Sequence, residues 1–391
     1  MRKTFLTVIS VLLLFSCTST KVETADVKST SPDNLNIVIC GDIMCHTQNF
    51  KTRDFSLIWD GIKDITLNSD LTIANVEAPV CDDRPFENYP NFNMQPSYPQ
   101  AAIDAGVNLI TVANNHTNDQ GVNGIISTAQ WINSVHENYQ GTDRPVYING
   151  LKQDVSTAKK ASQSPITFNC FKIKNYDVIF LGITQILNTS TANERINYFP
   201  FNEKGNNELK DLVIKLKQEN PCDLFILAVH TDEPEYILDI FEDHRNFYLE
   251  LLDAGVDILW SNHPHVVKPA EYFADSKTKK IKKVILYSTG NTISGQRSRP
   301  NYENPTAIRD YTGDGFLVTL NLKKTPKGIY ITNHKRDYIT TFIDKERNYL
   351  IKRMSPEFYE YLVTNGYESW EPYLRSREKA LDDVKDIITW Q

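Results

Sequence analysis

Residues 36–46 have the sequence NIVICGDIMCH, in which a short apolar run ends at a glycine and an aspartate. The β-branched residues of the run favour a strand, and the glycine and aspartate after it favour a turn. The same order returns in LTIANVEAP at residues 71–79 and in LITVANNHTNDQG at residues 109–121. Each apolar run therefore predicts a buried strand that ends in polar side chains suited to chemistry.

Strands and helices are expected to alternate through most of the chain. The apolar runs predict strands at Asn36–Cys40, Leu71–Ala74, Leu109–Ala113, Val178–Ile183, Leu224–Val229, Ile258–Trp260, Val284–Tyr287 and Phe316–Leu322. Amphipathic stretches predict helices at Ser56–Leu67, Pro99–Ala105, Val122–Val135, Glu208–Glu219 and Arg245–Ala254. Because the two kinds of segment alternate, we expect an α/β fold with a layered sheet.

The N-terminus predicts export and a lipid anchor. Arg2 and Lys3 precede the apolar run Phe5–Phe15, which is too short to span a bilayer but suits a signal peptide. Ser16-Cys17 follows directly and resembles the lipobox of bacterial lipoproteins, in which the cysteine is lipidated. Such chains anchor a protein because each buried methylene contributes about 0.8 kcal/mol. The alternative is a plain secretory signal with an incidental cysteine.

Four regions follow from these patterns. Residues 1–17 are expected to form the signal peptide, and residues 18–34, rich in Ser and Thr, a polar tether. Residues 35–335 would form the main domain. Residues 336–391 have a helical and charged pattern, which predicts a C-terminal helical appendage. The expected location is the cell envelope, with the domain exported to the periplasmic or surface side of a membrane.

Charge and cysteine usage exclude some classes of function. The 391 residues carry a formal net charge of -7, which argues against a nucleic-acid partner. The dense basic run Lys277–Lys283 is better explained by a hairpin turn than by a binding patch. The cysteines after Cys17 have spacings that fit no zinc or disulfide framework, so we expect them to be small core residues.

Polar residues of a few types directly follow the predicted strands. They are Asp42, His46, Asn75, Glu77, Asn114, Asn115, His116, His230, His263, His265 and Asn291. Open α/β sheets bind their ligands beyond the carboxyl ends of the strands, so these side chains predict one site. Carboxylate, amide and imidazole groups suit one or two divalent ions of Mn, Fe or Zn. A carboxylate that bridges two ions about 3.5–4 Å apart would activate water and clamp a phosphoryl oxygen.

Five ordered motifs carry a resemblance to a known family. They are Gly41-Asp42-Ile43-Met44, Asn75-Val76-Glu77-Ala78-Pro79, Asn114-Asn115-His116-Thr117-Asn118-Asp119-Gln120-Gly121, His263-Pro264-His265-Val266 and Tyr287-Ser288-Thr289-Gly290-Asn291. Over roughly residues 35–322 they resemble the CapA family of bacterial capsule (poly-γ-glutamate) synthesis proteins, a branch of the calcineurin-like metallophosphatase superfamily. The resemblance implies a four-layer α/β/β/α sandwich with a metallophosphatase-like centre, followed here by the C-terminal helical extension.

The resemblance also implies a set of metal ligands. Asp42 would bind a first metal, Glu77 would bridge two metals, and Asn115 would bind the second. The remaining ligands would be His230, His263 and His265.

Other residues would act on the substrate or support the ligands. His116 would face the leaving oxygen as a general acid or charge stabiliser. Asp119 would orient His116 through a hydrogen bond. Asn75 and Asn291 would contact the substrate or hold the ligands in place.

Two departures from the family pattern bear on these roles. Met44 stands where the superfamily usually has histidine, and His46 would replace that imidazole only if its loop folds back. After His230 the family usually has Trp-Gly and then Glu-Tyr, whereas residues 231–236 here are TDEPEY.

Two functions from different classes follow. In the first, the protein is an envelope lipoprotein that acts on a surface polymer or phosphoester substrate and hydrolyses a phosphoester or a related bond. In the second, it is a non-catalytic subunit that binds a polymer or organises an envelope synthase complex. The missing imidazole favours the second, and the retained Glu77, Asn115 and His116 favour the first.

Overall fold

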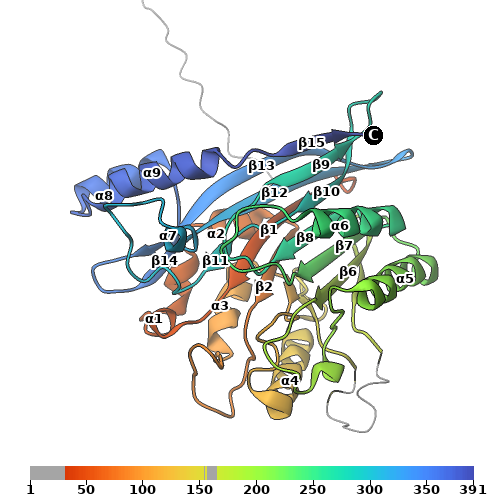
Figure 1. The fold of residues 1–391 in the computed structure, drawn as a ribbon, viewed down its shortest axis with the longest axis horizontal. Coiled ribbons are helices and arrows are strands. Elements are labelled where there is room, and N and C mark those ends of the chain that lie inside the picture. The colour runs from red at the N-terminus through yellow and green to blue at the C-terminus, as the bar shows by residue number, and fades with distance from the viewer. Residues whose placement is uncertain (1–30, 154, 156–164) are drawn as a thin grey trace, which may run out of the picture.

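The computed structural model describes residues 31–153, 155 and 165–391 (Figure 1). Its helices are α1 (Thr47–Phe50), η1 (Phe55–Trp59), α2 (Lys63–Asn68), α3 (Ser97–Asp104), α4 (Gly121–Tyr139), η3 (Asn193–Arg195), α5 (Glu203–Glu219), α6 (Glu242–Ala254), α7 (Ile308–Tyr311), α8 (Pro356–Thr364) and α9 (Trp370–Asp382). Its strands are β1 (Asn34–Ile43), β2 (Leu71–Val76), β3 (Leu109–Thr111), β4 (Tyr147–Asn149), β5 (Asn169–Ile173), β6 (Tyr176–Thr184), β7 (Leu224–His230), β8 (Ile258–Asn262), β9 (Ala270–Ala274), β10 (Ile281–Leu286), β11 (Asn291–Ile293), β12 (Asp314–Thr325), β13 (Gly328–Ile343), β14 (Tyr349–Arg353) and β15 (Ile387–Trp390).

The strands form one continuous sheet with two halves. Hydrogen-bonded neighbours follow the order β4-β3-β2-β1-β12-β13-β10-β8-β7-β6-β5. Strands β1 to β4 are parallel in the first half, and β6, β7, β8 and β10 are parallel in the second. A single residue pair between β10 and β13, Ile281 with Ile331, joins the halves. The sheet can therefore bend sharply at this junction.

Alternate residues of β6 show what covers each face of the second half. Ile179 and Leu181 pack in an apolar cluster with residues of α5 and α6, whereas Val178 and Phe180 belong to the larger cluster around β1 and β2. A Cβ on Gly182 of β6 would lie only 2.2 Å from Thr111 Oγ1 of β3, so the two halves of the sheet touch. Helices α3 and α4 lie on the side away from α5 and α6 (Figure 1). These layers confirm the predicted α/β/β/α sandwich.

One predicted helix is interrupted. The stretch expected at Ser56–Leu67 forms η1 and α2, with a turn at residues 60–62 between them. A Cβ on Gly61 would lie 2.2 Å from the backbone oxygen of Ile351 in β14, so the chain passes close to that strand. The interruption depends on a contact between two residues almost 300 positions apart in the chain, so the local sequence pattern does not predict it.

The C-terminal region corrects the expectation for residues 336–391. Helices α8 and α9 form, but β13 crosses the boundary expected after residue 335 and β14 pairs with it. Strand β15 then pairs in parallel with β9, with Trp390 beside Ala274. Residues 332–337 in the middle of β13 are all polar or charged, so the strand shows no long apolar run. The region therefore carries the predicted helices, but it also adds strands to the main sheet.

The predicted signal peptide, lipidated Cys17 and residues 18–30 of the tether lie outside the described residues. Among the helices that are described, none has both the length and the apolar character needed to cross a bilayer. The basic run at residues 277–283 belongs to the hairpin between β9 and β10, as predicted. Cys170, on the end strand β5, is exposed, whereas the other described cysteines are buried or half-buried.

Candidate metal centre

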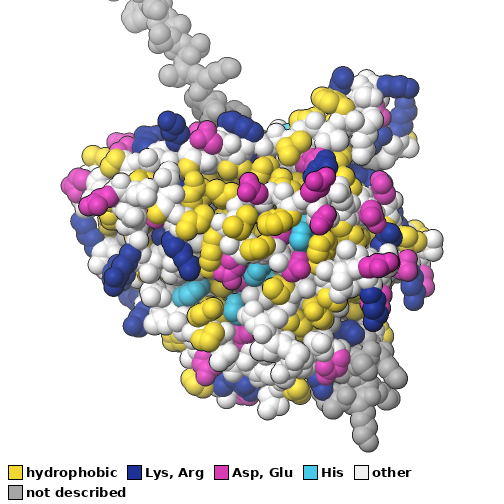
Figure 2. All heavy atoms as spheres, viewed as in Figure 1, with side chains coloured by type: hydrophobic (Ala, Val, Ile, Leu, Met, Phe, Trp, Pro, Cys, Tyr) yellow, Lys and Arg dark blue, Asp and Glu magenta, His cyan; other side chains and the backbone are white. Residues whose placement is uncertain are grey.

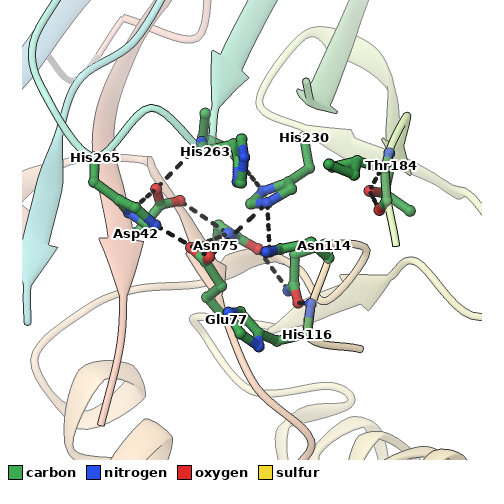
Figure 3. A network of polar contacts seen from close by, with 12 residues as sticks. Asp42, Asn75, Glu77, Asn114, His116, Thr184, His230, His263 and His265 are labelled. Carbon is green, nitrogen blue, oxygen red and sulfur yellow. Dashed lines mark hydrogen bonds and ion pairs between the residues drawn. The ribbon is translucent and has the colours of Figure 1, made fainter. Parts of the chain in front are cut away.

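The carboxyl ends of the central strands meet at one place. Asp42 lies at the end of β1 and Glu77 directly follows β2, while His230 is the last residue of β7. His263 and His265 directly follow β8. Figure 3 shows that these side chains point toward one another. In the space-filling view, histidine and acidic side chains gather in the middle of one face of the molecule (Figure 2).

Two glycines allow Asp42 to reach this point. A Cβ on Gly41 would lie 1.8 Å from the carbonyl oxygen of Gly290, so only glycine fits there. The amide of Asp42 donates to the same carbonyl at 3.2 Å, and Asp42 stands opposite Asn291 in the β1–β11 ladder. Gly290 has φ +72°, a left-handed conformation that favours glycine. The first and last of the five motifs are therefore joined through their backbones.

Buried amide side chains hold the two carboxylates in position. Asn75 Nδ2 donates to Asp42 Oδ1 at 2.8 Å and to Glu77 Oε2 at 3.3 Å. Asn75 Oδ1 in turn accepts from Asn114 Nδ2 at 3.1 Å. All four residues are fully buried, so these hydrogen bonds are shielded from water. The ends of β1, β2 and β3 are thereby linked.

Three imidazoles surround the free side of Glu77. Its Oε1 lies 3.5 Å from His265 Nε2 and 3.9 Å from His230 Nε2. The rings of His230 and His263 are 4.8 Å apart between centroids. His265 Nδ1 lies 3.3 Å from Asp42 Oδ2 and 3.0 Å from Asn291 Oδ1.

The backbone of the His-Pro-His segment has an uncommon conformation. His263 has φ +104° and His265 φ +56°, and non-glycine residues seldom adopt positive φ. Such conformations cluster at functional sites, where the surrounding structure maintains them. Here they turn both rings toward Glu77.

Burial sets the protonation of the cluster. It lowers the pKa of His230 and of His263 well below the usual range, so both rings are neutral near pH 7. Burial, together with the charges of Asp42 and Glu235, raises the pKa of Glu77. Burial opposes the protonated form of His265, but the hydrogen bond with Asp42 and the negative charge of Asp42 raise the pKa of that ring. Neutral imidazoles offer lone pairs, which is the state that binds metals.

The donor set fits a divalent cation. Glu77 Oε1 and His263 Nδ1 are buried and have no hydrogen-bond partner within the described residues. Unpaired buried acceptors are rare in proteins and commonly mark a missing ion or water. Donor atoms of Glu77, His230 and His263 lie within 4.8 Å of one another, as do those of Asp42, Glu77 and His265. Glu77 is shared by both groups, as the family resemblance implied for a bridging carboxylate.

Asn115 and His116 lie beside this cluster. Asn115 Oδ1 is 2.9 Å from His230 Nε2, so its amide oxygen can join the same group of donors. His116 Nδ1 lies 2.6 Å from Asp119 Oδ2, whose pKa burial raises. The carboxylate contact places the ring proton on Nδ1, which leaves Nε2 available to a ligand. Asn188, from the loop after β6, also contacts His116 Nδ1, at 3.1 Å.

A pocket of about 370 Å³ opens over the cluster. It is lined by Met44, His46, Gln48, Asn88, Tyr89, His116, Glu235, Tyr236, His265, Gly295, Gln296 and Arg309. The loop after Glu77 supplies part of its wall through Asn88 and Tyr89, and Phe92 of the same loop packs edge-on against both His46 and His116.

His46 faces the pocket rather than the cation donors. Its Nδ1 accepts a hydrogen bond from the amide of Gly295 at 3.1 Å. Burial, with the nearby rings of His265 and His116, lowers the pKa of His46 to about 3. Within the described residues, His46 belongs to none of the close groups of possible metal ligands. It therefore does not replace the imidazole missing at Met44.

Sequence reasoning missed several residues of the site. Glu235 lies within 4.8 Å of donor atoms of His263 and His265, although it is five residues beyond the end of β7. Asn262 contacts His230 Nδ1, and Arg309 reaches the pocket from α7. The available signal for Glu235 was the Glu-Tyr pair that the family usually has after this histidine, which recurs here as Glu235-Tyr236. No signal pointed to Arg309, because its position depends on the path of a long loop.

Comparisons with known proteins point to one family. The family described as bacterial capsule synthesis protein PGA_cap matches residues 36–296. The PGA biosynthesis protein CapA of Bacillus subtilis (strain 168) is 25% identical over 327 residues, which cover 82% of this chain and 76% of that protein. The capsule biosynthesis protein CapA of Bacillus anthracis is 23% identical over 381 residues, covering 88% and 79%. Among solved structures, the calcineurin-like phosphoesterase YfkN of Bacillus subtilis aligns with a TM-score of 0.40 at 13% identity, covering 78% of this chain and 90% of that one.

Proposed function

Because the chain belongs to the bacterial capsule synthesis protein PGA_cap family, we propose that it is an envelope lipoprotein of capsule polymer biosynthesis with a metal-dependent hydrolase site. The reaction would cleave a phosphoester or a related bond in the polymer or its precursor. The observation that carries the proposal is the shared, unpaired Glu77 oxygen between His230 and His265.

The cation donors lie beside a group that can move a proton. One or two divalent ions, when bound, would supply Lewis-acid activation of water and of the scissile group. His116 lines the pocket next to these donors, with Nδ1 held by Asp119. Once Nε2 has taken up a second proton from water, the imidazolium can give that proton to the leaving oxygen, while Asp119 fixes the orientation of the ring and stabilises its positive charge.

The pocket favours an anionic substrate that also accepts and donates hydrogen bonds. Arg309 is the one Lys or Arg among its described lining residues, and its guanidinium lies 4.3 Å from the ring centroid of Tyr236. The amide side chains of Gln48, Asn88 and Gln296 line the same space. A chain that carries carboxylates and amides, or a phosphoester, would match this lining.

The predicted anchor would join the domain at the end opposite the site. The described chain starts at residue 31 and enters β1 at Asn34, whereas Asp42 lies near the other end of the same strand. A strand rises about 3.3 Å per residue, so roughly 26 Å separates the two ends. A lipid on Cys17 would therefore leave the pocket accessible to substrate.

Hydrolysis tests the enzymatic part of the proposal. The purified full chain, supplied with Mn²⁺, is expected to cleave bis(p-nitrophenyl) phosphate, and His116→Ala should lower kcat by about 100-fold or more. His334→Ala is a matched control, because His334 stacks on Tyr272 away from the pocket. Metal content near zero, with equal rates for the wild type and His116→Ala, would sink the enzymatic proposal.

Membrane fractionation tests the anchor. Cys17→Ala is expected to move the protein from the membrane to the soluble fraction. Cys170→Ala, which removes an exposed thiol of β5, should leave it at the membrane. Membrane retention of Cys17→Ala would contradict the lipoprotein assignment.

One observation favours the non-catalytic alternative. Met44 places a thioether at the pocket, a weak ligand for the hard ions that carboxylates select. In this alternative the pocket binds polymer for a synthase complex without cleaving it. Metal and polymer binding without any hydrolysis by the wild type would support it over the enzyme.

A further inference from the structure

Glu235 is a carboxylate of the site to which neither the strand-end pattern nor the family resemblance assigned a role. It is half-buried and lines the pocket beside Tyr236 and His265. Its segment, residues 231–240, connects the end of β7 to α6 and has no regular secondary structure. The position of its side chain therefore depends on contacts made by this segment.

Two contacts fix the segment against the His-Pro-His turn. The amide of Tyr236 donates to the carbonyl oxygen of Pro264 at 2.9 Å, with Tyr236 in a left-handed conformation at φ +66°. On the other side of Glu235, buried Glu233 accepts from Lys268 Nζ at 2.9 Å. Glu235 thus lies between two anchors to the segment that carries His263 and His265.

Donor atoms of Glu235, His263 and His265 all lie within 4.8 Å of one another. Two ligands of one ion lie at most about 4.6 Å apart when each is 2.0–2.3 Å from it, so a small movement of these side chains would bring all three onto one ion. His263 Nδ1 is buried and has no hydrogen-bond partner within the described residues, so this nitrogen is available to an ion. We propose that Glu235, His263 and His265 together ligate a divalent cation on the pocket side of the cluster.

The residue types agree with this assignment. Two imidazoles and one carboxylate form a three-ligand set that leaves coordination positions open for water or substrate. Glu235 lines the pocket, so the open positions face the space that a substrate would enter. Met44 lines the same pocket but offers only a thioether. The group formed by Asp42, Glu77 and His265 has only three donors. Glu235 supplies a further hard donor to the same pocket, beside His265.

The inference rests on the proposed metal site, and Mn²⁺ binding tests it without reference to activity. The purified full chain is stripped with a chelator and titrated with Mn²⁺ by calorimetry. Glu235→Gln is expected to weaken binding of one ion at least 10-fold, because it removes a direct ligand. Asp239→Asn makes the same charge change at an exposed residue of the same segment and should stay within twofold of the wild type. Equal thermal midpoints of the metal-free proteins show that each variant is folded.

The outcomes separate this inference from the proposed function. Unchanged Mn²⁺ affinity in Glu235→Gln, with metal-dependent hydrolysis in the wild type, would overturn the role of Glu235 alone. Weakened binding in Glu235→Gln, with no hydrolysis by the wild type, would support it and overturn the enzymatic proposal. A wild type that binds no Mn²⁺ would overturn both.

Discussion

Two buried charged clusters of this protein differ in how their charges are balanced. In the arginine cluster, formed by Arg297, Asp314 and Arg377, each carboxylate oxygen of Asp314 accepts from a guanidinium at 2.7 Å. In the cation cluster, formed by Asp42, Glu77, His230, His263 and His265, Glu77 Oε1 lacks any donor within the described residues. In the first cluster guanidinium groups satisfy both oxygens of the carboxylate, whereas in the second one carboxylate oxygen is left for an ion.

This difference separates structure from function. The arginine cluster joins α9 to β12 and the loop before it, so it holds the C-terminal region on the sheet. The cation cluster lies at strand ends under a pocket, and its two neutral imidazoles, His230 and His263, cannot offset its carboxylates. Removing one partner of a buried ion pair leaves an uncompensated charge, which destabilises the fold. A buried carboxylate that has no partner costs stability until a ligand binds it.

The largest expected effect is on the arginine cluster. Asp314→Asn removes the charge that offsets two buried guanidinium groups, so the free energy of unfolding should fall by about 3–5 kcal/mol. Urea denaturation of the metal-free protein measures the loss. A loss below about 1 kcal/mol would show that water or other groups balance the arginines.

Glu77→Gln should produce the opposite pattern. It removes the carboxylate shared by two donor groups, so Mn²⁺ affinity should fall on the order of 100-fold, or about 2.7 kcal/mol. Metal-free stability should stay equal or rise, because the variant removes a buried charge that has no donor on one oxygen. Calorimetric titration and urea denaturation check both parts. Strong destabilisation without metal would mean that Glu77 is structural.

Glu271 gives a pH-dependent case of a paired carboxylate. Burial opposes its ionisation, but hydrogen bonds from Arg245, Thr389 and Tyr287 hold the pKa of Glu271 below its ordinary 4.5. Because the pKa of Glu271 is lower in the folded protein than in the unfolded chain, the ionised carboxylate stabilises the fold above the unfolded pKa. This stabilisation is lost as the pH falls through the pKa of the folded protein. Glu271→Gln should therefore cost about 2 kcal/mol at pH 7. The difference from the wild type should shrink below about pH 4.5 in urea titrations, and a constant difference would refute the assignment.

The smallest expected effect concerns the rim of the pocket. Arg309 is exposed, so its charge is screened by water, and Arg309→Gln should raise KM for an anionic substrate only about two- to fivefold. kcat should not change, because Arg309 lies outside the cation cluster. Steady-state kinetics at two salt concentrations check this, since added salt should reduce the difference between the two proteins. A large fall in kcat would place Arg309 at the reacting bond.

The sequence predicted the centre of the fold better than its edges. Glu77, His230 and His263 follow apolar runs directly, so their place at the strand ends is encoded locally. Glu235 reaches the cluster only through the backbone contact between Tyr236 and Pro264, which no local pattern contains.

The strands at the end of the chain were missed for a related reason. The middle of β13, residues 332–337, is entirely polar or charged, so its apolar residues are split into two short groups. β15 exists because it pairs with β9, more than a hundred residues earlier. Periodicity indicates which face of an element is buried, but it does not indicate which distant strand will cover it.

Anomalous diffraction from crystals grown with Mn²⁺ tests the central claim most directly. We expect a manganese peak about 2.0–2.3 Å from a Glu77 oxygen and from a nitrogen of His263 or His265. Absence of any such peak within about 4 Å of Glu77, at saturating Mn²⁺, would contradict the assignment of this cluster as a metal centre.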